Sequence, residues 1–218
     1  MLVRVSDIDA FRRWREDPES ELGDLLANLR RETPASEAML AGTAFHAALE
    51  TVQPGEVDRL EAQGYTFLID ADADLAISEI RELRAGKDYV MPDGYVVTVS
   101  GQVDALQGKR VEDHKTTGQM DAERFFTGYQ WRFYLDIHDA TTFRWNVFEL
   151  APASERRIEE MRKRGEVVPD GPVYVVRSCH RLEQYRYPEM QADCQALVEA
   201  FYAFARVHLP ERIAQEAA

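Results

Sequence analysis

Two β-rich runs, residues 95–104 and 110–116, most constrain the fold of this 218-residue chain. They flank a short segment at Gln107 and Gly108, and this arrangement predicts a β-hairpin. Because successive side chains of a strand point to opposite faces, the first run has an apolar and a polar face. The apolar face carries Val97, Val99 and Val103, and the polar face carries Thr98, Ser100, Gln102 and Asp104.

The second run places two charged side chains on one face. Asp113 and Lys115 are two residues apart, so both point to the same side of the strand. If the loop holds an even number of residues centred on 107–108, Asp104 lies opposite Val111 and shares the face of Asp113 and Lys115. The sequence therefore predicts that two carboxylates and a lysine converge.

The remaining patterns predict a mixed α/β fold. We interpret Ser6 as the N-cap of a first helix and Asp121 as the cap of a later one. Residues 56–94 stay ambiguous, because 56–62 fits a short helix and 70–86 fits a helix or a strand. Further helices are expected near residues 36–52, 121–140, 154–165 and 188–209, and strands at 141–150 and within 172–187.

One compact domain is expected from the length and the composition. A chain of 218 residues with 45% hydrophobic content can build one sizeable core. The domain, residues 1–218, divides into a helical part over about 1–94, the hairpin and its following helix over about 95–140, and strands and a helix over about 141–218.

The composition also predicts a soluble protein of the cytoplasm. The two cysteines, Cys179 and Cys194, fit neither a disulfide framework nor a paired metal motif, which favours a reducing compartment. We find no apolar run long enough to span a membrane and no secretory leader. The net charge of −13 argues against nonspecific affinity for nucleic acids, without excluding a polyanion that is held through divalent metals.

Taken singly, each chemistry-bearing residue has an ordinary explanation. A histidine on an apolar helix, such as His46, is usually a core residue, and a lone Asp-x-Lys is usually a weak surface ion pair. Together, however, the hairpin carboxylates and this imidazole would supply ligands for Mg²⁺ or Mn²⁺. Lys115 would then orient water or offset charge on a phosphate. The combination favours phosphodiester hydrolysis.

Four motifs resemble those of the PD-(D/E)XK nuclease superfamily, in its RecB-like branch, which includes phage-type exonucleases. They stand in the family's order, and the opening RVSDIDAFRRW also resembles the family's first helix. The motifs are GTAFHAALE (42–50), GQVDAL (101–106), EDHKTTG (112–118) and YQWRFY (129–134). The resemblance implies a restriction-endonuclease-like α/β (α+β) core, in which helices flank a central mixed β-sheet.

The resemblance also implies which residues hold metal and carry out catalysis. His46, Asp104 and Asp113 would ligate the metal, and the backbone carbonyl of His114 would be a further ligand. Lys115 would take the role of the family's catalytic lysine. The implied cofactor is one or two Mg²⁺ or Mn²⁺ ions.

Four other positions near these motifs are assigned or excluded by the family resemblance or by helix and strand geometry. Gln130 and Tyr134 correspond to the family's Q-x-x-x-Y element, near the DNA and the active site. Glu50, one helical turn after His46, is a weaker candidate that would support the metal ligands. Glu112 points to the opposite face of its strand and is excluded.

Two differences from RecB-like relatives restrict the cofactors and activities that we expect of this chain. Many RecB-like proteins carry an iron–sulfur cluster, but two late cysteines are too few to bind one, so no cluster is expected. No G-x-x-x-x-G-K-[ST] phosphate loop occurs, so no ATP-driven unwinding is expected from this chain. The resemblance therefore implies a stand-alone, metal-dependent deoxyribonuclease in a bacterial or phage-infected cell.

The expected activity is that of an exonuclease in DNA recombination, DNA repair or phage DNA processing, alongside a single-strand annealing protein. Two alternatives remain open: an inactive nuclease fold that binds DNA or docks a protein, and an endonuclease of the resolvase or restriction type. The polarity of digestion, the strand preference and the oligomeric state are left open. The densest basic group in the chain is a weak candidate for DNA contact, and a solvated surface helix explains it equally well. It consists of Arg156, Arg157, Arg162, Lys163 and Arg164.

Overall fold

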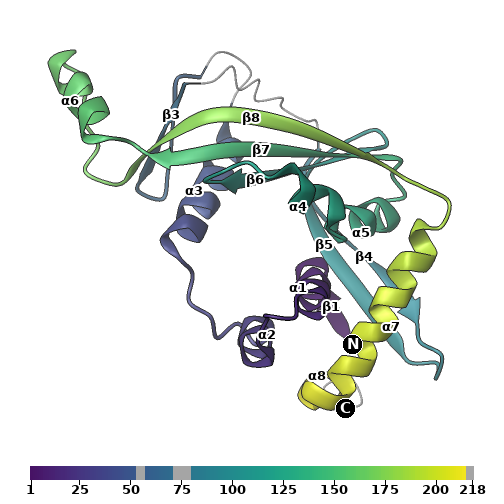
Figure 1. Cartoon of the computed structure of the whole chain (residues 1–218). Helices are drawn as coiled ribbons and strands as arrows, with labels where there is room; N and C mark the ends of the chain where they lie inside the picture. Colours follow the sequence, from purple (N-terminus) through teal and green to yellow (C-terminus); the bar gives the residue numbers. More distant parts are fainter. Residues whose placement is uncertain (53–56, 71–79, 215–218) are drawn as a thin grey trace.

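The computed structural model describes residues 1–52, 57–70 and 80–214, and these form an eight-stranded mixed β-sheet with helices packed on it (Figure 1). The strands are β1 (Leu2–Arg4), β2 (Arg59–Ala62), β3 (Tyr65–Ile69), β4 (Ile80–Val90), β5 (Val96–Gln107), β6 (Arg110–Thr117), β7 (Thr142–Pro152) and β8 (Val173–Tyr185). The helices are α1 (Val5–Glu16), α2 (Leu22–Leu29), α3 (Glu37–Thr51), α4 (Ala122–Thr127), α5 (Gln130–Ile137), α6 (Glu155–Lys163), α7 (Met190–His208) and α8 (Pro210–Ala214). The predicted class, a central mixed sheet flanked by helices, is confirmed.

The strand order is β1-β5-β6-β7-β8-β3-β2, and β4 pairs with the other edge of β5. Three neighbouring pairs are parallel, namely β1 with β5, β6 with β7, and β3 with β8, and the others are antiparallel. Parallel pairs need a crossover between their strands, and α4 and α5 supply it between β6 and β7. This crossover carries the Gln130 and Tyr134 side chains back over the sheet.

Two hydrophobic cores cover the two faces of the sheet. The larger core joins α1, α5 and α7 to one face, and it includes Val147 of β7. The smaller core joins α3 to the other face, and it includes Phe148, the next residue of the same strand. Alternation along β7 therefore assigns α3 and α5 to opposite sides of the sheet.

The predicted hairpin is present, but its register differs from the expectation. The turn consists of Gly108 and Lys109, and Val111 lies opposite Leu106 rather than Asp104. Gly108 adopts a φ of +58°, which glycine allows at no steric cost and which suits a two-residue turn. Because the turn is centred one residue later than expected, the predicted pairing of Asp104 with Val111 is wrong by two residues.

The helix predictions are confirmed in part. Ser36 caps α3, where its hydroxyl accepts a hydrogen bond from the Met39 backbone at 3.3 Å. The predicted cap at Ser6 is wrong, because α1 follows β1 directly and Arg4 occupies the N-cap without a side-chain bond. The single helix predicted over 121–140 is two helices, since the chain turns to an extended conformation at Gly128.

The segment left ambiguous is strand-rich where the structure describes it. Residues 59–62 form β2 rather than a short helix, and residues 80–86 belong to β4. Positions 53–56 and 71–79 lie outside the described residues. Within the described ranges, no helix is long and apolar enough to cross a bilayer.

Candidate active site

A gap in the pairing of β5 is the structural basis of the site. Along one edge of β5, β1 pairs with residues 98–100 and β6 pairs with residues 105–107. Between them, residues 101–104 have no strand partner on that edge in the described chain. The ring of Tyr134 lies against Gly101 so closely that a Cβ atom there would overlap it. Glycine at 101 therefore lets α5 seat a tyrosine in the gap.

Asp104 lies at the end of this gap and holds the two strands together. Its Oδ2 accepts a hydrogen bond of 2.5 Å from the His114 backbone nitrogen, and its Oδ1 lies 3.6 Å from Nδ1 of His46. Burial opposes ionisation of this carboxyl, but the adjacent His46 and the charge of Lys115 outweigh burial and lower the pKa of Asp104. Asp104 is therefore an anion at neutral pH.

His46 reaches Asp104 because α3 packs unusually close to β6. One turn before His46, a Cβ atom on Gly42 would lie 2.7 Å from Oγ1 of Thr116, which is closer than atoms of this kind approach. A glycine at this position removes the side chain that would push the helix outward. The GTAFH sequence thus sets the distance of α3 from the sheet and the reach of its histidine.

Asp113 and Lys115 form an ion pair on the face of β6 that α5 covers. Asp113 is 2% exposed, and burial raises its pKa to about 6, helped by the negative charge of Asp104 and opposed by Lys115. The Lys115 ammonium also lies 5.4 Å from the ring centre of Trp145. Asp104 and Asp113 therefore interact electrostatically, although they approach the gap from opposite sides of the sheet.

The Gln130 and Tyr134 pair lies beside Asp113. Nε2 of Gln130 donates a hydrogen bond of 3.0 Å to the Tyr134 hydroxyl, and the tyrosine ring stacks on Phe143. Burial raises the pKa of Tyr134 well above its usual value, and the charge of Asp113 raises it further. The phenol is therefore neutral and keeps its proton for a donor role.

His114 was expected to lend its backbone carbonyl alone, but its side chain also belongs to the site. Its ring lies 6.2 Å from that of His46, on the face covered by α3, and Nδ1 lies 3.3 Å from the Asn146 amide. Burial lowers the pKa of His114, which keeps the imidazole neutral. Strand alternation predicts that this ring points away from Asp113 and Lys115. It was not assigned to the site because Asp104 was expected on the face of Asp113, and not on the face of His46.

The two glutamates near the motifs lie where the alternation and the helical spacing suggest. Glu112 is buried away from Asp113 and accepts hydrogen bonds from Arg110 at 2.8 Å and Asn146 at 3.0 Å. Glu50 lies close enough to His46 and Asp104 to interact with their charges, and burial together with a hydrogen bond to Glu82 raises its pKa. Glu50 is thus next to the ligand candidates.

The donor atoms of the site are of the types that bind a hard divalent cation, but their positions do not form a complete coordination shell. In the described ranges, no three His, Cys, Asp or Glu side chains are gathered closely enough to hold a metal ion. Apart from its ion pair with Lys115, the buried Oδ2 of Asp113 accepts no hydrogen bond from the described residues. Two carboxylates and an imidazole are ligand types that Mn²⁺ and, for the oxygens, Mg²⁺ accept.

A cavity of about 410 Å³ opens next to Lys115 and Gln130. We call it the Lys115 cavity. Its walls carry Arg12 and Arg13 of α1 and Arg124 of α4, against one acid, Asp9. The sequence alone does not single out these arginines, because they come from two helices that meet only in the folded chain. The cavity joins a lysine of the candidate site to the exposed Arg124 and to Arg12 and Arg13, which pair with Asp9.

The basic helix that the sequence suggested for DNA contact is largely neutralised. Arg156 pairs with Glu160 at 2.9 Å and Arg162 with Glu159 at 3.3 Å. Two other arginines pair with Asp70 and Glu166, at 2.6 Å each; these are Arg157 and Arg164. Figure 1 shows α6 beyond one end of the long β7–β8 ribbon, away from α1, α5 and α7. The role of these residues and of Lys163 in DNA contact stays a prediction.

Comparison with known proteins shows the fold. No protein-family model matches the chain, and no curated protein matches it. The chain is similar to the crystal structure of SSO0001, with 17% identity and a TM-score of 0.51 over 93% of this chain and 76% of that one. It is also similar to LHK-Exo in complex with dAMP, with 16% identity and a TM-score of 0.41 over 99% and 94% of the two chains. The first likeness indicates a shared overall fold.

Proposed function

We propose that this chain is a metal-dependent deoxyribonuclease that hydrolyses phosphodiester bonds. The observation that carries the proposal is the convergence of Asp104, Asp113 and Lys115 at the gap in β5, with His46 beside Asp104. One buried and one half-buried carboxylate that repel each other next to a lysine are typical of a site that binds a cation and acts on a phosphate. The resemblance of four sequence motifs to PD-(D/E)XK nucleases supports the same chemistry.

The protein would hold one or two Mg²⁺ or Mn²⁺ ions through His46, Asp104, Asp113 and the His114 backbone carbonyl. A cation bound there supplies Lewis-acid stabilisation of the phosphate and lowers the pKa of the attacking water. Asp113, with a pKa of about 6, is ionised at neutral pH and available as a ligand. A cation would relieve the repulsion between the two carboxylates.

The side chains around the carboxylates position the substrate. The Lys115 ammonium holds a phosphate oxygen and offsets the negative charge that develops on it. Gln130 donates to the oxygen of the Tyr134 hydroxyl, which directs the phenolic proton away from the amide. We assign that proton to a phosphate oxygen in the gap. These contacts fix the phosphate without any change in the protonation of the tyrosine.

The Lys115 cavity supports a nucleic-acid substrate rather than a small phosphate ester. Arg124 is exposed and has no carboxylate partner among the described residues, so it extends the cationic surface beyond Lys115, where a phosphate next to the scissile one would lie. Arg12 and Arg13 of the same cavity are already paired with Asp9. Action on DNA ends, and a role in recombination, repair or phage DNA processing with a single-strand annealing partner, are part of the proposal. They rest on the family resemblance.

A cleavage assay tests the proposal. The purified protein should degrade linear duplex DNA in Mg²⁺ or Mn²⁺ and be inactive in EDTA. Lys115→Ala should abolish cleavage, whereas Lys109→Gln should retain it, because Lys109 pairs with Asp139 at the hairpin turn and lies outside both the gap and the cavity. Equal activity of the Lys115 variant would refute the mechanism. Cleavage of circular DNA would instead indicate an endonuclease.

A second candidate function is an inactive nuclease fold that binds DNA. The observation that favours it is the direct pairing of Lys115 with Asp113, together with the absence of a gathered metal cluster among the described residues. Calorimetry separates the two candidates. Heat of Mn²⁺ binding that disappears in Asp113→Asn supports the enzyme, and DNA binding without any metal binding supports the alternative.

A further inference from the structure

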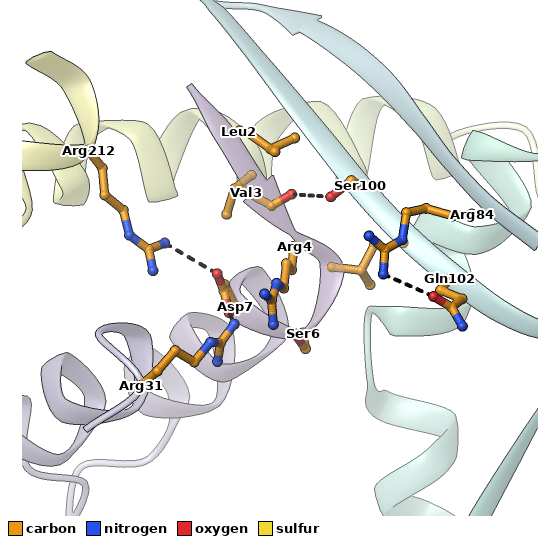
Figure 2. Close-up of a pocket in the computed structure, with 12 residues that line it drawn as sticks. Leu2, Val3, Arg4, Ser6, Asp7, Arg31, Arg84, Ser100, Gln102 and Arg212 are labelled. Atoms are coloured by element: carbon orange, nitrogen blue, oxygen red, sulfur yellow. Dashed lines mark hydrogen bonds and ion pairs between the residues drawn. The ribbon is translucent and has the colours of Figure 1, made fainter. Parts of the chain in front are cut away.

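A second basic cavity, of about 520 Å³, lies where β1 and α1 meet β5 and α8 (Figure 2). We call it the arginine cavity. Four arginines from separate parts of the chain line it: Arg4, Arg31, Arg84 and Arg212. Among the described residues that line it, Asp7 is the only carboxylate. In a chain of net charge −13, this concentration of positive charge is unusual and indicates an anionic ligand.

Asp7 organises one wall of the cavity without neutralising it. The carboxylate is 3% exposed and binds both Arg31, through Oδ1, and Arg212, through Oδ2 at 3.2 Å. Figure 2 shows the guanidinium groups of Arg31, from the turn after α2, and of Arg212, from α8, approaching Asp7 from two sides. One negative charge therefore holds two positive charges in fixed positions, and the wall remains cationic.

The opposite wall has no carboxylate to balance its charge. Nη2 of Arg84 donates to the amide oxygen of Gln102 at 3.0 Å, which is a neutral partner. Arg4 is exposed, and no ion pair or hydrogen bond of its side chain occurs within the described ranges. Gln102 thus orients the Arg84 guanidinium while leaving its charge available to a ligand.

The arginine cavity adjoins the candidate active site along β5. Gln102 is two residues from Asp104 on that strand, which corresponds to about 7 Å and to the same face. Arg84 lies directly opposite Gln102 on β4. The stretch of β5 that forms the gap, residues 101–104, also contributes Gly101 and Gln102 to the cavity wall. A phosphate at Asp104 and one in the cavity can therefore belong to one strand.

We propose that the arginine cavity binds a backbone phosphate of the DNA strand near the one that is cleaved, and so directs the strand along β5. The proposal rests on the proposed nuclease function. Guanidinium groups match the geometry of phosphate oxygens and bind them without reading the bases. The cavity is thus a sequence-independent contact that positions the strand, and the groups that face the reacting phosphate lie elsewhere.

The test measures DNA affinity and cleavage in Arg84→Gln and Arg4→Gln. Both side chains are exposed and neither is paired with a carboxylate in the described residues, so these variants should fold normally. The matched control is Arg206→Gln, which removes the same charge from α7, outside both cavities. In EDTA, the dissociation constant of a short oligonucleotide should rise about tenfold for Arg84→Gln and less than twofold for the control.

Cleavage kinetics separate failure of this proposal from failure of the proposed function. Arg84→Gln should raise the KM for DNA about tenfold and leave kcat within twofold, because the contact binds the ground and transition states equally. If the wild-type protein cleaves DNA and Arg84→Gln has an unchanged dissociation constant and KM, the arginine cavity is not a strand contact and the nuclease function stands. A wild-type protein that neither binds nor cleaves DNA overturns both.

A modified substrate identifies the source of the phosphate. An oligonucleotide with an uncharged methylphosphonate near the cleaved bond should bind the wild-type protein more weakly, and Arg84→Gln should add no further loss. Inorganic phosphate serves as the competing probe in calorimetry. Additive losses from the methylphosphonate and the variant, together with binding of inorganic phosphate to the wild-type protein alone, would show a free-anion site and overturn the proposal.

Discussion

The gap site and the arginine cavity lie side by side on β5, yet they carry charge in opposite ways. In the gap, Asp113 is buried and repelled by Asp104, which raises its pKa to about 6. In the cavity, the arginines are largely open to solvent and gathered around one buried carboxylate. The first arrangement stores unfavourable electrostatic energy that a cation relieves, and the second presents a field that attracts an anion. The contrast is what a metal-dependent enzyme needs for a polyanionic substrate.

The strongest test of this contrast is Asp113→Asn. Loss of the buried carboxylate should lower the cleavage rate at least about a thousandfold, because a ligand of the proposed cation is removed. Binding of DNA in EDTA should stay within twofold of the wild type, since the arginine cavity is intact. Parallel cleavage and anisotropy measurements decide the matter. A large loss of DNA affinity would mean that the two regions do not act separately.

The stored electrostatic energy should be visible in metal-free protein as a pH effect. The pKa of Asp113 is about 6 in the folded state, above its unfolded value, so its contribution is fully present below about pH 4 and is lost as pH rises through 6. Relative to Asp113→Asn, the wild type should lose about 2 to 3 kcal/mol of unfolding free energy over that range. Urea unfolding in EDTA at several pH values measures the difference. If the difference in unfolding free energy between the wild type and Asp113→Asn does not change with pH, the pKa of Asp113 is not raised in the folded protein.

Removal of the carboxylate in the arginine cavity should destabilise the protein at neutral pH, whereas removal of the Asp113 carboxylate should not. Asp7→Asn should destabilise the protein by about 2 kcal/mol at neutral pH, because Arg31 and Arg212 lose their shared partner. We take a value below that of a fully buried pair, since the Arg31 side chain is 44% exposed. Urea unfolding at pH 7 measures it. Stabilisation by Asp7→Asn would contradict the role of Asp7 as the organising group.

The smallest expected effect concerns α6, where basic residues are dense but paired. Arg156→Gln should change the DNA affinity less than twofold, because Glu160 already compensates that charge. The same anisotropy assay compares it with Arg84→Gln. A loss as large as that of Arg84→Gln would restore α6 as a DNA contact and weaken the distinction between paired and converging arginines.

Part of the geometry of the candidate site could be predicted from the sequence, because the spacing of those residues is local. Asp113 and Lys115 are two residues apart on a strand, and Gln130 and Tyr134 are one turn apart on a helix. The structure keeps both relations. The position of Asp104 could not be predicted in detail, because a shift of the turn by one residue moves the register by two. The approach of Asp104 to Asp113 and Lys115 depends on the gap in β5. That gap arises from the way β1 and β6 pair with β5, so it cannot be read from the sequence of one strand.

The arginine cavity could not be predicted from the sequence. Its arginines, at positions 4, 31, 84 and 212, span nearly the whole chain, and none has a basic neighbour pattern that predicts the others. The basic run of α6 was instead singled out, although glutamates at helical spacing compensate it. Likewise, residues 70–86 stay open between helix and strand in the sequence, because the Arg, Glu, Leu and Ala residues that begin β4 also favour helix, and pairing with β5 decides the outcome.

The short ladder between β5 and β6 has a consequence for cooperativity. β6 is bonded to β7 over eight residue pairs but to β5 over three. The sheet is therefore two extensively bonded halves, joined at a narrow seam on which Asp104 and Asp113 lie. Local opening at this seam breaks few hydrogen bonds and leaves both halves folded. Amide exchange should accordingly divide the sheet into two protected groups, with Asp104 and Asp113 at the boundary between two folding units.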